Sequence, residues 1–174
     1  MVASLATRSR QDWPNGFGRS DEFARERAHG FAIAIPPVER GEVVGIIPEH
    51  LVRLEVGHQG TSELLVVGSM HERKQKMADL SDGFAVLPGG LGTMDETFEI
   101  VTWKQLRLHD KPIVLVDVAG YWKPLIGMVE HMIKEGFVQP AHRRLFGVVD
   151  KVEDVIPTLE AMPAPAFSPD VKWA

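Results

Sequence analysis

A short apolar run that leads through a glycine-rich turn into a long helical pattern constrains the fold of this chain most strongly. The run is Phe84–Val86, and three glycines occupy four positions at Gly89–Gly92, ahead of a helix predicted from about Thr93 to Leu108. Glycines remove the Cβ atoms that would keep a phosphate away from the backbone. A helix start just behind them offers N–H donors and a partial positive charge. This strand–turn–helix unit therefore predicts a phosphate-binding crevice.

Apolar runs and helical patterns alternate along most of the chain. Strands are predicted at residues 42–47, 64–67, 84–87, 112–118 and 146–149, the first two as buried strands. Besides the helix after the glycine turn, helices are predicted from Ser69 onward, over residues 121–135 with Gly136 as the stop, and over 152–161. This alternation predicts an α/β fold: a Rossmann-like, doubly wound parallel sheet with helices on both faces.

Two parts of the pattern are less regular. In the helix after the glycine turn the apolar residues fit one face only loosely; they are Phe98, Val101, Leu106 and Leu108. Prolines and glycines interrupt residues 1–40, where a short helix is predicted at 21–28 and a strand at 31–35. The tail at residues 163–174 is predicted to be irregular.

Composition narrows the class of protein. The 174 residues carry a net charge of −5, which argues against nucleic acid as an electrostatically captured partner. The chain has no cysteine, so thiolate nucleophiles, disulfides and cysteine metal sites are excluded. No apolar stretch approaches the length of a membrane span, and the first residues lack the apolar core of a secretory signal. We expect a cytoplasmic protein that has a single domain over residues 1–174 and binds no membrane.

Each candidate site residue of the glycine segment has two interpretations. The backbone of Gly89, Gly90, Gly92 and Thr93 either binds phosphate at the carboxyl end of a strand or forms a tight turn that needs glycine. Glu96 is either a carboxylate beside a reacting sugar, where it would stabilise an oxocarbenium-like transition state or orient water, or the last residue of a capping box with Thr93.

The helix predicted from Ser69 carries a second candidate pair. Arg73 and Lys74 are cations near a helix start, where the helix dipole disfavours them, so a nearby anion would explain their position. The alternative is a solvated helix face. Other conspicuous residues are interpreted as structural: Met70, Met77, Trp103 and Trp122 as packing residues, and His71 as a structural or supporting residue.

Two of these segments together resemble a known family. Met70-His71-Glu72-Arg73-Lys74 matches its MHxRK motif, and Pro88–Glu96 matches its PGGxGTxxE motif, at the expected separation. The chain therefore resembles the Lonely Guy family of cytokinin-activating phosphoribohydrolases over roughly residues 41–160. The similarity continues through Thr102–Leu106, His109–Pro112, Gly120–Trp122 and Glu135–Phe137.

The resemblance implies hydrolysis of the N-glycosidic bond of a nucleoside 5′-monophosphate, such as an N6-modified adenosine 5′-monophosphate, to a free base and ribose 5-phosphate. By matching position, Glu96 and Arg73 would be the catalytic pair, with Glu96 beside the ribosyl cation or the water and Arg73 supporting the charge of the phosphate or the departing base. The implied substrate-binding residues are Glu55, Lys74, Gly89, Gly90, Leu91, Gly92, Thr93 and Thr102. The resemblance also implies a dimer or a larger assembly, of which we expect a homodimer, with no metal or other cofactor, and no pyridoxal-phosphate signature is present.

Residues 1–40 depart from the family pattern. They show neither the initial strand with its Gly-Ser turn nor the GGGxxGLMG segment. The alternative function is therefore a nucleotide-binding or carrier protein on the same fold, catalytically impaired by its altered N-terminal segment. Residues 41–160 would be its family-like core.

Overall fold

The computed structural model describes residues 2–5, 44–52 and 63–163. These residues belong to two compact units, Met1–Phe84 and Ala85–Ala174, and each unit is described by itself. The predicted helix at 21–28 and the predicted strand at 31–35 lie outside the described residues.

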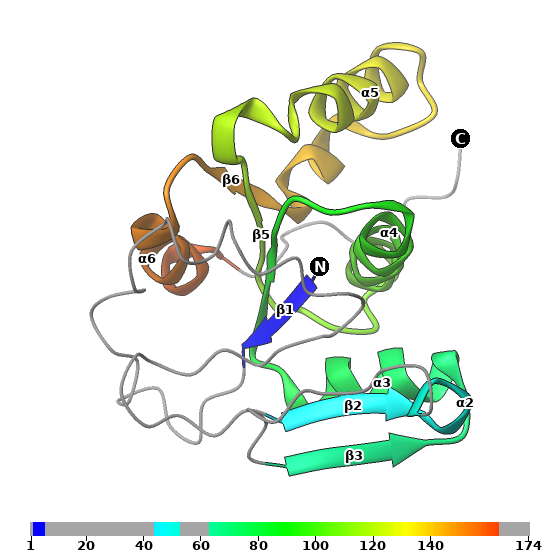
Figure 1. The fold of residues 1–174 in the computed structure, drawn as a ribbon. Coiled ribbons are helices and arrows are strands. Elements are labelled where there is room, and N and C mark those ends of the chain that lie inside the picture. Colours follow the sequence, from blue (N-terminus) through cyan, green and yellow to red (C-terminus); the bar gives the residue numbers. More distant parts are fainter. Residues whose placement is uncertain (1, 6–43, 53–62, 164–174) are drawn as a thin grey trace. The chain divides into compact units, whose positions relative to one another are not determined.

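The first unit contains a two-stranded parallel sheet with a helix packed against it (Figure 1). Strands β2 (Val44–Pro48) and β3 (Glu63–Val67) pair so that Val44 lies opposite Glu63, and the short helix α2 (Glu49–Val52) follows β2. Helix α3 (Met70–Leu80) packs on this sheet. Ile46, Val67 and Met77 form the buried cluster, and the partly buried Leu65 packs against it.

Strand β3 corrects one prediction. Leu64 and Val66 are 47% and 55% exposed, so β3 is buried on one face only and is not the fully buried strand that its apolar run predicted. Because side chains alternate across a strand and α3 packs on this small sheet, alternate residues of β3 stay uncovered within the chain.

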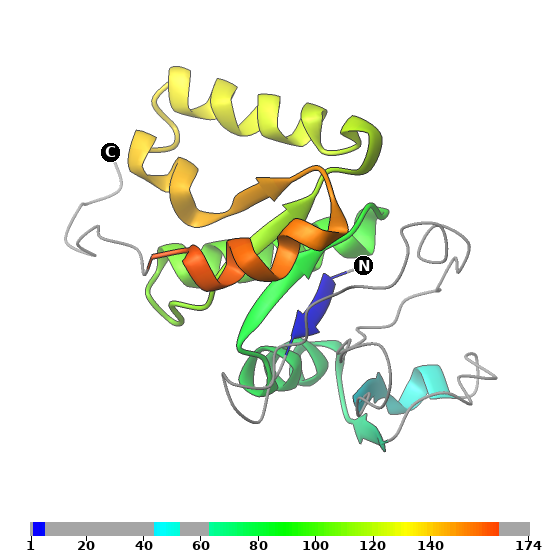
Figure 2. The same ribbon diagram turned by 90° about the vertical axis from the view of Figure 1, so that its left-hand side faces the viewer.

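The second unit is built around the consecutive strands β4 (Gly83–Val86), β5 (Ile113–Val116) and β6 (Gly147–Val149), of which β4 begins in the first unit. β5 and β6 are parallel, and every residue of β5 is fully buried. Helices α4 (Leu91–Gln105) and α6 (Val155–Ala161) cover opposite faces of this sheet, as Figures 1 and 2 show together. The other elements are α5 (Lys123–Lys134) and the 3-10 turns η1 (Val118–Gly120), η2 (Pro140–Leu145) and η3 (Val152–Asp154).

The fold class is confirmed: the chain is α/β, with parallel strands and helices consistent with a Rossmann-like fold. Ser69 caps α3 as predicted, and Gly136 follows α5 with a φ of 81°. One strand was missed: β1 (Val2–Leu5) neighbours β4, so the expectation that residues 1–40 show no initial strand is wrong. Only four residues long, it carries little periodic signal.

No helix among the described residues is both long enough and apolar enough to cross a lipid bilayer.

Candidate functional site

Helix α4 begins two residues earlier than predicted. Gly90 is its N-cap residue, and no side chain caps the helix there. Thr93 is therefore the third helical residue and not the cap, so the capping-box interpretation of Glu96 is wrong. The first turn also contains no acidic residue. The start of α4 thus has neither the side-chain acceptor nor the negative charge that usually stabilise a helix start.

The glycines at this start are not required by the conformation of the chain. Gly90 has a φ of −90°, Gly92 lies inside the helix, and neither is among the glycines with positive φ. A Cβ atom built on either residue meets no other atom within 4 Å. The tight-turn interpretation is therefore wrong for Gly90 and Gly92, and the space beside them is open within the described chain.

Because α4 begins at Leu91 and not at Thr93, Glu96 lies beyond the first turn of the helix. It is the sixth residue of α4 and partly buried, and the helix rises about 7.5 Å from Leu91 to Glu96. Thr93 is buried on the same helix, where its carbonyl oxygen accepts a 2.6 Å hydrogen bond from the Thr97 hydroxyl.

The second motif lies on α3, in the first unit. The hydroxyl of Ser69 accepts a 3.1 Å hydrogen bond from the Glu72 N–H, and the Glu72 carboxylate accepts one of 2.7 Å from the Gly68 N–H. Arg73 is only 3% exposed, so the solvated-face interpretation is wrong for this residue. Lys74 is partly buried. Burying a guanidinium is costly unless it is paired, which favours an anionic environment for Arg73.

The remaining predicted residues are dispersed. Glu55 lies outside the described residues. Leu91 is 89% exposed at the start of α4. Thr102 is exposed near the end of the same helix, about 16 Å along the axis from Leu91. Within one chain, Thr102 therefore cannot reach a phosphate bound at the helix start.

One contact at the glycine turn was missed by the sequence analysis. The Tyr121 hydroxyl donates a 2.5 Å hydrogen bond to the carbonyl oxygen of Gly89. Tyr121 belongs to the Gly120-Tyr121-Trp122 segment that resembles the family, and this resemblance was the one sequence signal that pointed to it. The sequence could not predict its contact with Gly89, because the fold decides which residue lies beside a side chain 32 positions away.

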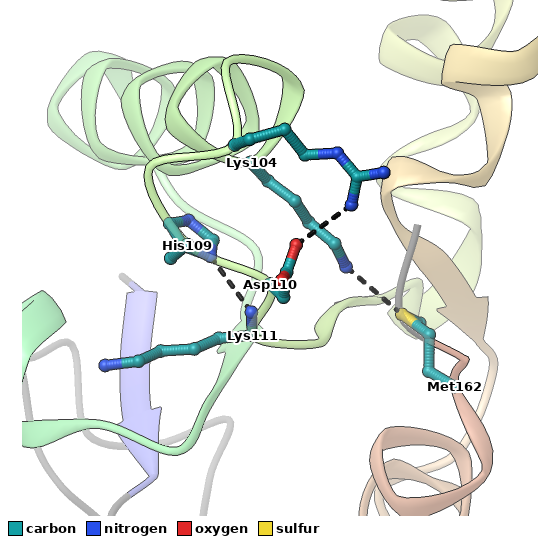
Figure 3. Close-up of polar contacts among 6 residues, drawn as sticks. Lys104, His109, Asp110, Lys111 and Met162 are labelled. Carbon is teal, nitrogen blue, oxygen red and sulfur yellow. Dashed lines mark hydrogen bonds and ion pairs between the residues drawn. The ribbon is translucent and has the colours of Figure 1, made fainter. Parts of the chain in front are cut away.

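The opposite end of α4 holds a buried cation (Figure 3). Lys104 is 1% exposed, and its Nζ donates to the Met162 sulfur at 3.6 Å. Burial lowers the pKa of Lys104 from 10.5 to about 8, and the charge of Asp110 opposes this shift in part. The burial of an amine beside a thioether is expensive for its charged form.

His109 ties the same end of the helix to the start of β5. Its Nδ1 accepts a 3.1 Å hydrogen bond from the Lys111 N–H, and its Nε2 lies 2.9 Å from the Ile100 carbonyl oxygen (Figure 3 shows the first contact). Because a backbone N–H can only donate, Nδ1 is unprotonated and Nε2 donates to Ile100. Burial lowers the pKa of His109, in agreement with a neutral ring.

The described part of the chain contains no group of three or more histidine, aspartate or glutamate side chains placed to hold a metal ion.

Comparison with known proteins gives one family. The family described as "Possible lysine decarboxylase" matches residues 32–159. A cytokinin riboside 5'-monophosphate phosphoribohydrolase of Rhodococcoides fascians is 45% identical over 122 residues, which cover 70% of this chain and 62% of that protein.

Plant relatives carry similar names. A probable cytokinin riboside 5'-monophosphate phosphoribohydrolase of Oryza sativa subsp. japonica is 43% identical, over 67% of this chain and 55% of the relative. A cytokinin riboside 5'-monophosphate phosphoribohydrolase of Arabidopsis thaliana is 39% identical, over 68% of this chain and 59% of the relative. The chain thus spans less than two thirds of the length of these curated relatives.

Proposed function

This chain belongs to the family described as "Possible lysine decarboxylase", and from this membership we propose that it hydrolyses an N6-modified adenosine 5′-monophosphate to the free base and ribose 5-phosphate. The names of its relatives support this reaction over a decarboxylation. The reaction adds water across the bond between C1′ of the ribose and the base nitrogen. The water oxygen joins C1′, and the base leaves with a proton.

The observation that carries the proposal is the start of α4. Gly90 and Gly92 leave open space beside a helix start that has no side-chain cap, and Glu96 follows on the same helix. Backbone N–H groups at such a start can bind a phosphate dianion without a cationic side chain. A 5′-phosphate held there would leave the ribose to extend along the helix toward Glu96.

Glu96 is the proposed catalytic carboxylate. As the glycosidic bond breaks, positive charge develops on C1′ and the ring oxygen of the ribose, and a nearby carboxylate stabilises it. The same carboxylate can orient the attacking water. No other carboxylate lies in the first six residues of α4 except Asp95, which is exposed.

Two residues of α3 are proposed as substrate contacts on the family resemblance. Arg73 would balance the negative charge of the phosphate or of the departing base, and Lys74 would contact the phosphate or the ribose. Glu55 is proposed as a further substrate contact on the family resemblance alone.

Thr102 fits this scheme in a homodimer. Because it lies about 16 Å along α4 from the helix start, Thr102 would contact substrate bound by a second copy of the chain. A homodimer is therefore part of the proposal. The proposal includes no metal or other cofactor. It includes no nucleic-acid partner, which the net charge of −5 supports, and it includes a cytoplasmic location.

The test is release of ribose 5-phosphate from AMP and from isopentenyladenosine 5′-monophosphate. Glu96→Gln should lower kcat by about 10²- to 10⁴-fold, because the neutral amide neither stabilises the cation nor activates water. Asp95→Asn is the matched control: it removes a neighbouring exposed charge and should leave kcat within about twofold of the wild-type value.

The outcomes separate the candidate functions. Release that Glu96→Gln abolishes supports the hydrolase. A folded wild-type protein that binds the nucleotides but releases no sugar phosphate would instead support the nucleotide-binding alternative. A decarboxylase would bind pyridoxal phosphate and show its visible absorbance band, which a spectrum after incubation with that cofactor would detect.

A further inference from the structure

The Tyr121 hydroxyl connects the loop after β5 to the glycine turn after β4. It donates a 2.5 Å hydrogen bond to the Gly89 carbonyl oxygen, and both residues lie in the second unit. Although Tyr121 is 46% exposed, its ring packs edge-on against the buried Trp122, with ring centroids 5.0 Å apart and planes at 88°. The ring is therefore oriented by packing while its hydroxyl reaches the turn.

The loop that carries Tyr121 is fixed from both sides. The Asp117 carboxylate is buried and accepts a 2.6 Å hydrogen bond from the Trp122 N–H, while the Asp117 N–H donates to the Val149 carbonyl oxygen at 2.7 Å. Between them Ala119 and Gly120 both adopt positive φ, of 55° and 76°. A left-handed alanine is unfavourable and persists only where its surroundings hold it. The loop therefore accepts backbone strain in the conformation that presents Tyr121.

The hydrogen bond acts on one particular peptide group. The carbonyl of Gly89 and the N–H of Gly90 belong to the same planar unit, so fixing one fixes the direction of the other. With glycine on both sides, this peptide plane has more rotational freedom than any plane between residues with side chains. A donor on the carbonyl also polarises the amide, which makes the Gly90 N–H a stronger donor.

We infer that Tyr121 is a positioning residue for the phosphate monoester of the substrate: its hydroxyl holds the Gly89–Gly90 peptide so that the Gly90 N–H points into the open space at the start of α4. This inference rests on the phosphate site of the proposed function and does not depend on hydrolysis. It explains why an exposed tyrosine is held by a strained loop beside a helix start that has no side-chain cap.

Tyr121→Phe isolates the hydroxyl, because it keeps the ring and its contact with Trp122. Ribose 5-phosphate is the probe, with its affinity measured by calorimetry. The dissociation constant should rise about 3- to 10-fold, the usual consequence of losing one hydrogen bond. In the protein without ligand, the amide resonance of Gly90 should shift, since its carbonyl partner loses a donor.

Asp110→Ala is the matched control. It removes an exposed hydrogen bond, the 3.1 Å contact with Arg107, at the opposite end of α4. This variant should leave both the Gly90 resonance and the affinity unchanged. The two variants should have similar melting temperatures. A loss of affinity in Tyr121→Phe alone then reflects a local effect on the turn and not a general loss of stability.

Three results would overturn the inference. They are an unchanged affinity in Tyr121→Phe, an equal loss of affinity in Asp110→Ala, and a wild-type protein that does not bind ribose 5-phosphate. The proposed function fails separately: a protein that binds ribose 5-phosphate but hydrolyses no nucleotide is not a hydrolase, and weaker binding in Tyr121→Phe would still support the positioning role.

Discussion

The two ends of helix α4 are built in opposite ways. At its end, Leu108 N–H donates to the Trp103 carbonyl oxygen at 2.9 Å and Arg107 N–H to that of Lys104 at 3.2 Å. With Arg107 at a φ of 62°, these bonds form a Schellman motif. At its start, Gly90 has no side-chain cap, and no carboxylate lies in the first turn.

The two ends of α4 therefore differ in what they contribute, one to stability and the other to binding. The end is satisfied by the chain itself: the Schellman bonds, the His109 contacts and the ion pair between Arg107 and Asp110 all lie there. The start gives up the stabilisation of about 1 kcal/mol that a serine, threonine, asparagine or aspartate cap supplies. In this protein the helix end therefore contributes to folding, and the helix start is available to an anion.

The largest expected effect is at the closed end. Lys104→Met should raise the free energy of unfolding at pH 7 by about 3 kcal/mol, because burial lowers the pKa of Lys104 from 10.5 to about 8 and each pKa unit corresponds to about 1.4 kcal/mol. Denaturant unfolding measures this gain. Lys151→Met, at an exposed position, is the control and should have little effect. Hydrolysis should be unchanged in both variants.

The titration of Lys104 also makes the free energy of unfolding depend on pH. Between pH 8 and 10.5 the unfolded chain binds more protons at this residue than the folded chain, so stability rises with pH across that window. Below pH 8 the full cost of burying the charged amine is present. Lys104→Met should lose this rise, and stability profiles that run parallel for the two proteins from pH 7 to 10.5 would contradict the assignment.

A smaller effect is expected at the open start, with opposite signs for stability and binding. Gly92→Ala should raise the free energy of unfolding by about 0.5–1 kcal/mol, because alanine favours the helix. It should weaken ribose 5-phosphate binding about 10-fold, since a helical Cβ tilts toward the helix start and would occupy the anion's space.

Gly127→Ala in α5 is the matched control for this glycine. Its added Cβ also meets nothing within 4 Å, so it should gain stability without any loss of affinity. If Gly92→Ala binds ribose 5-phosphate as tightly as the wild type, the open space at the start of α4 is not where the phosphate lies.

The smallest expected effect is at the left-handed residue of the closed end. Arg107→Gly should stabilise the protein by about 0.5–1 kcal/mol, because glycine adopts positive φ without a Cβ penalty and the partly exposed ion pair with Asp110 contributes little. Arg107→Ala loses the ion pair but keeps the penalty, so it should not stabilise. A loss of stability in Arg107→Gly would show that the ion pair outweighs the strain.

Much of the fold was predictable because its signals are local. The apolar runs at residues 64–67 and 112–118 correspond to β3 at Glu63–Val67 and β5 at Ile113–Val116, since strands of parallel sheets are continuous apolar runs. Ser69 and Gly136 marked a helix start and a helix stop, and both act on neighbours within one turn.

Helix α4 shows where prediction from local sequence patterns failed. Its buried face consists of Thr93, Thr97, Ile100 and Lys104, three of them polar, whereas the apolar Phe98 is 39% exposed. Hydrophobic periodicity therefore indicated the wrong face. The helix also ends at Gln105 and not at Leu108, because the left-handed residue after it is Arg107 and no glycine marked the stop.

The candidate site was predictable to a similar extent. The motif positions Arg73 and Glu96 follow from sequence alone, as do the glycines ahead of Glu96, and their roles stay predictions. The sequence could not decide whether a side chain caps the start of α4, because the same residues are compatible with a capped and with an uncapped start. The backbone position of Gly90 at the helix start decided it.

The sequence by itself determined strands β2 to β6, the capped start of α3 and the glycine-rich turn, since each depends on residues a few positions apart. Tertiary structure decided two contacts between distant positions. The Tyr121 hydroxyl donates to the Gly89 carbonyl oxygen, 32 positions away, and Lys104 donates to the Met162 sulfur, 58 positions away. Contacts of this kind depend on which strands become neighbours and which helix faces they cover. No local pattern encodes that choice, because it is set by the burial of the whole sheet.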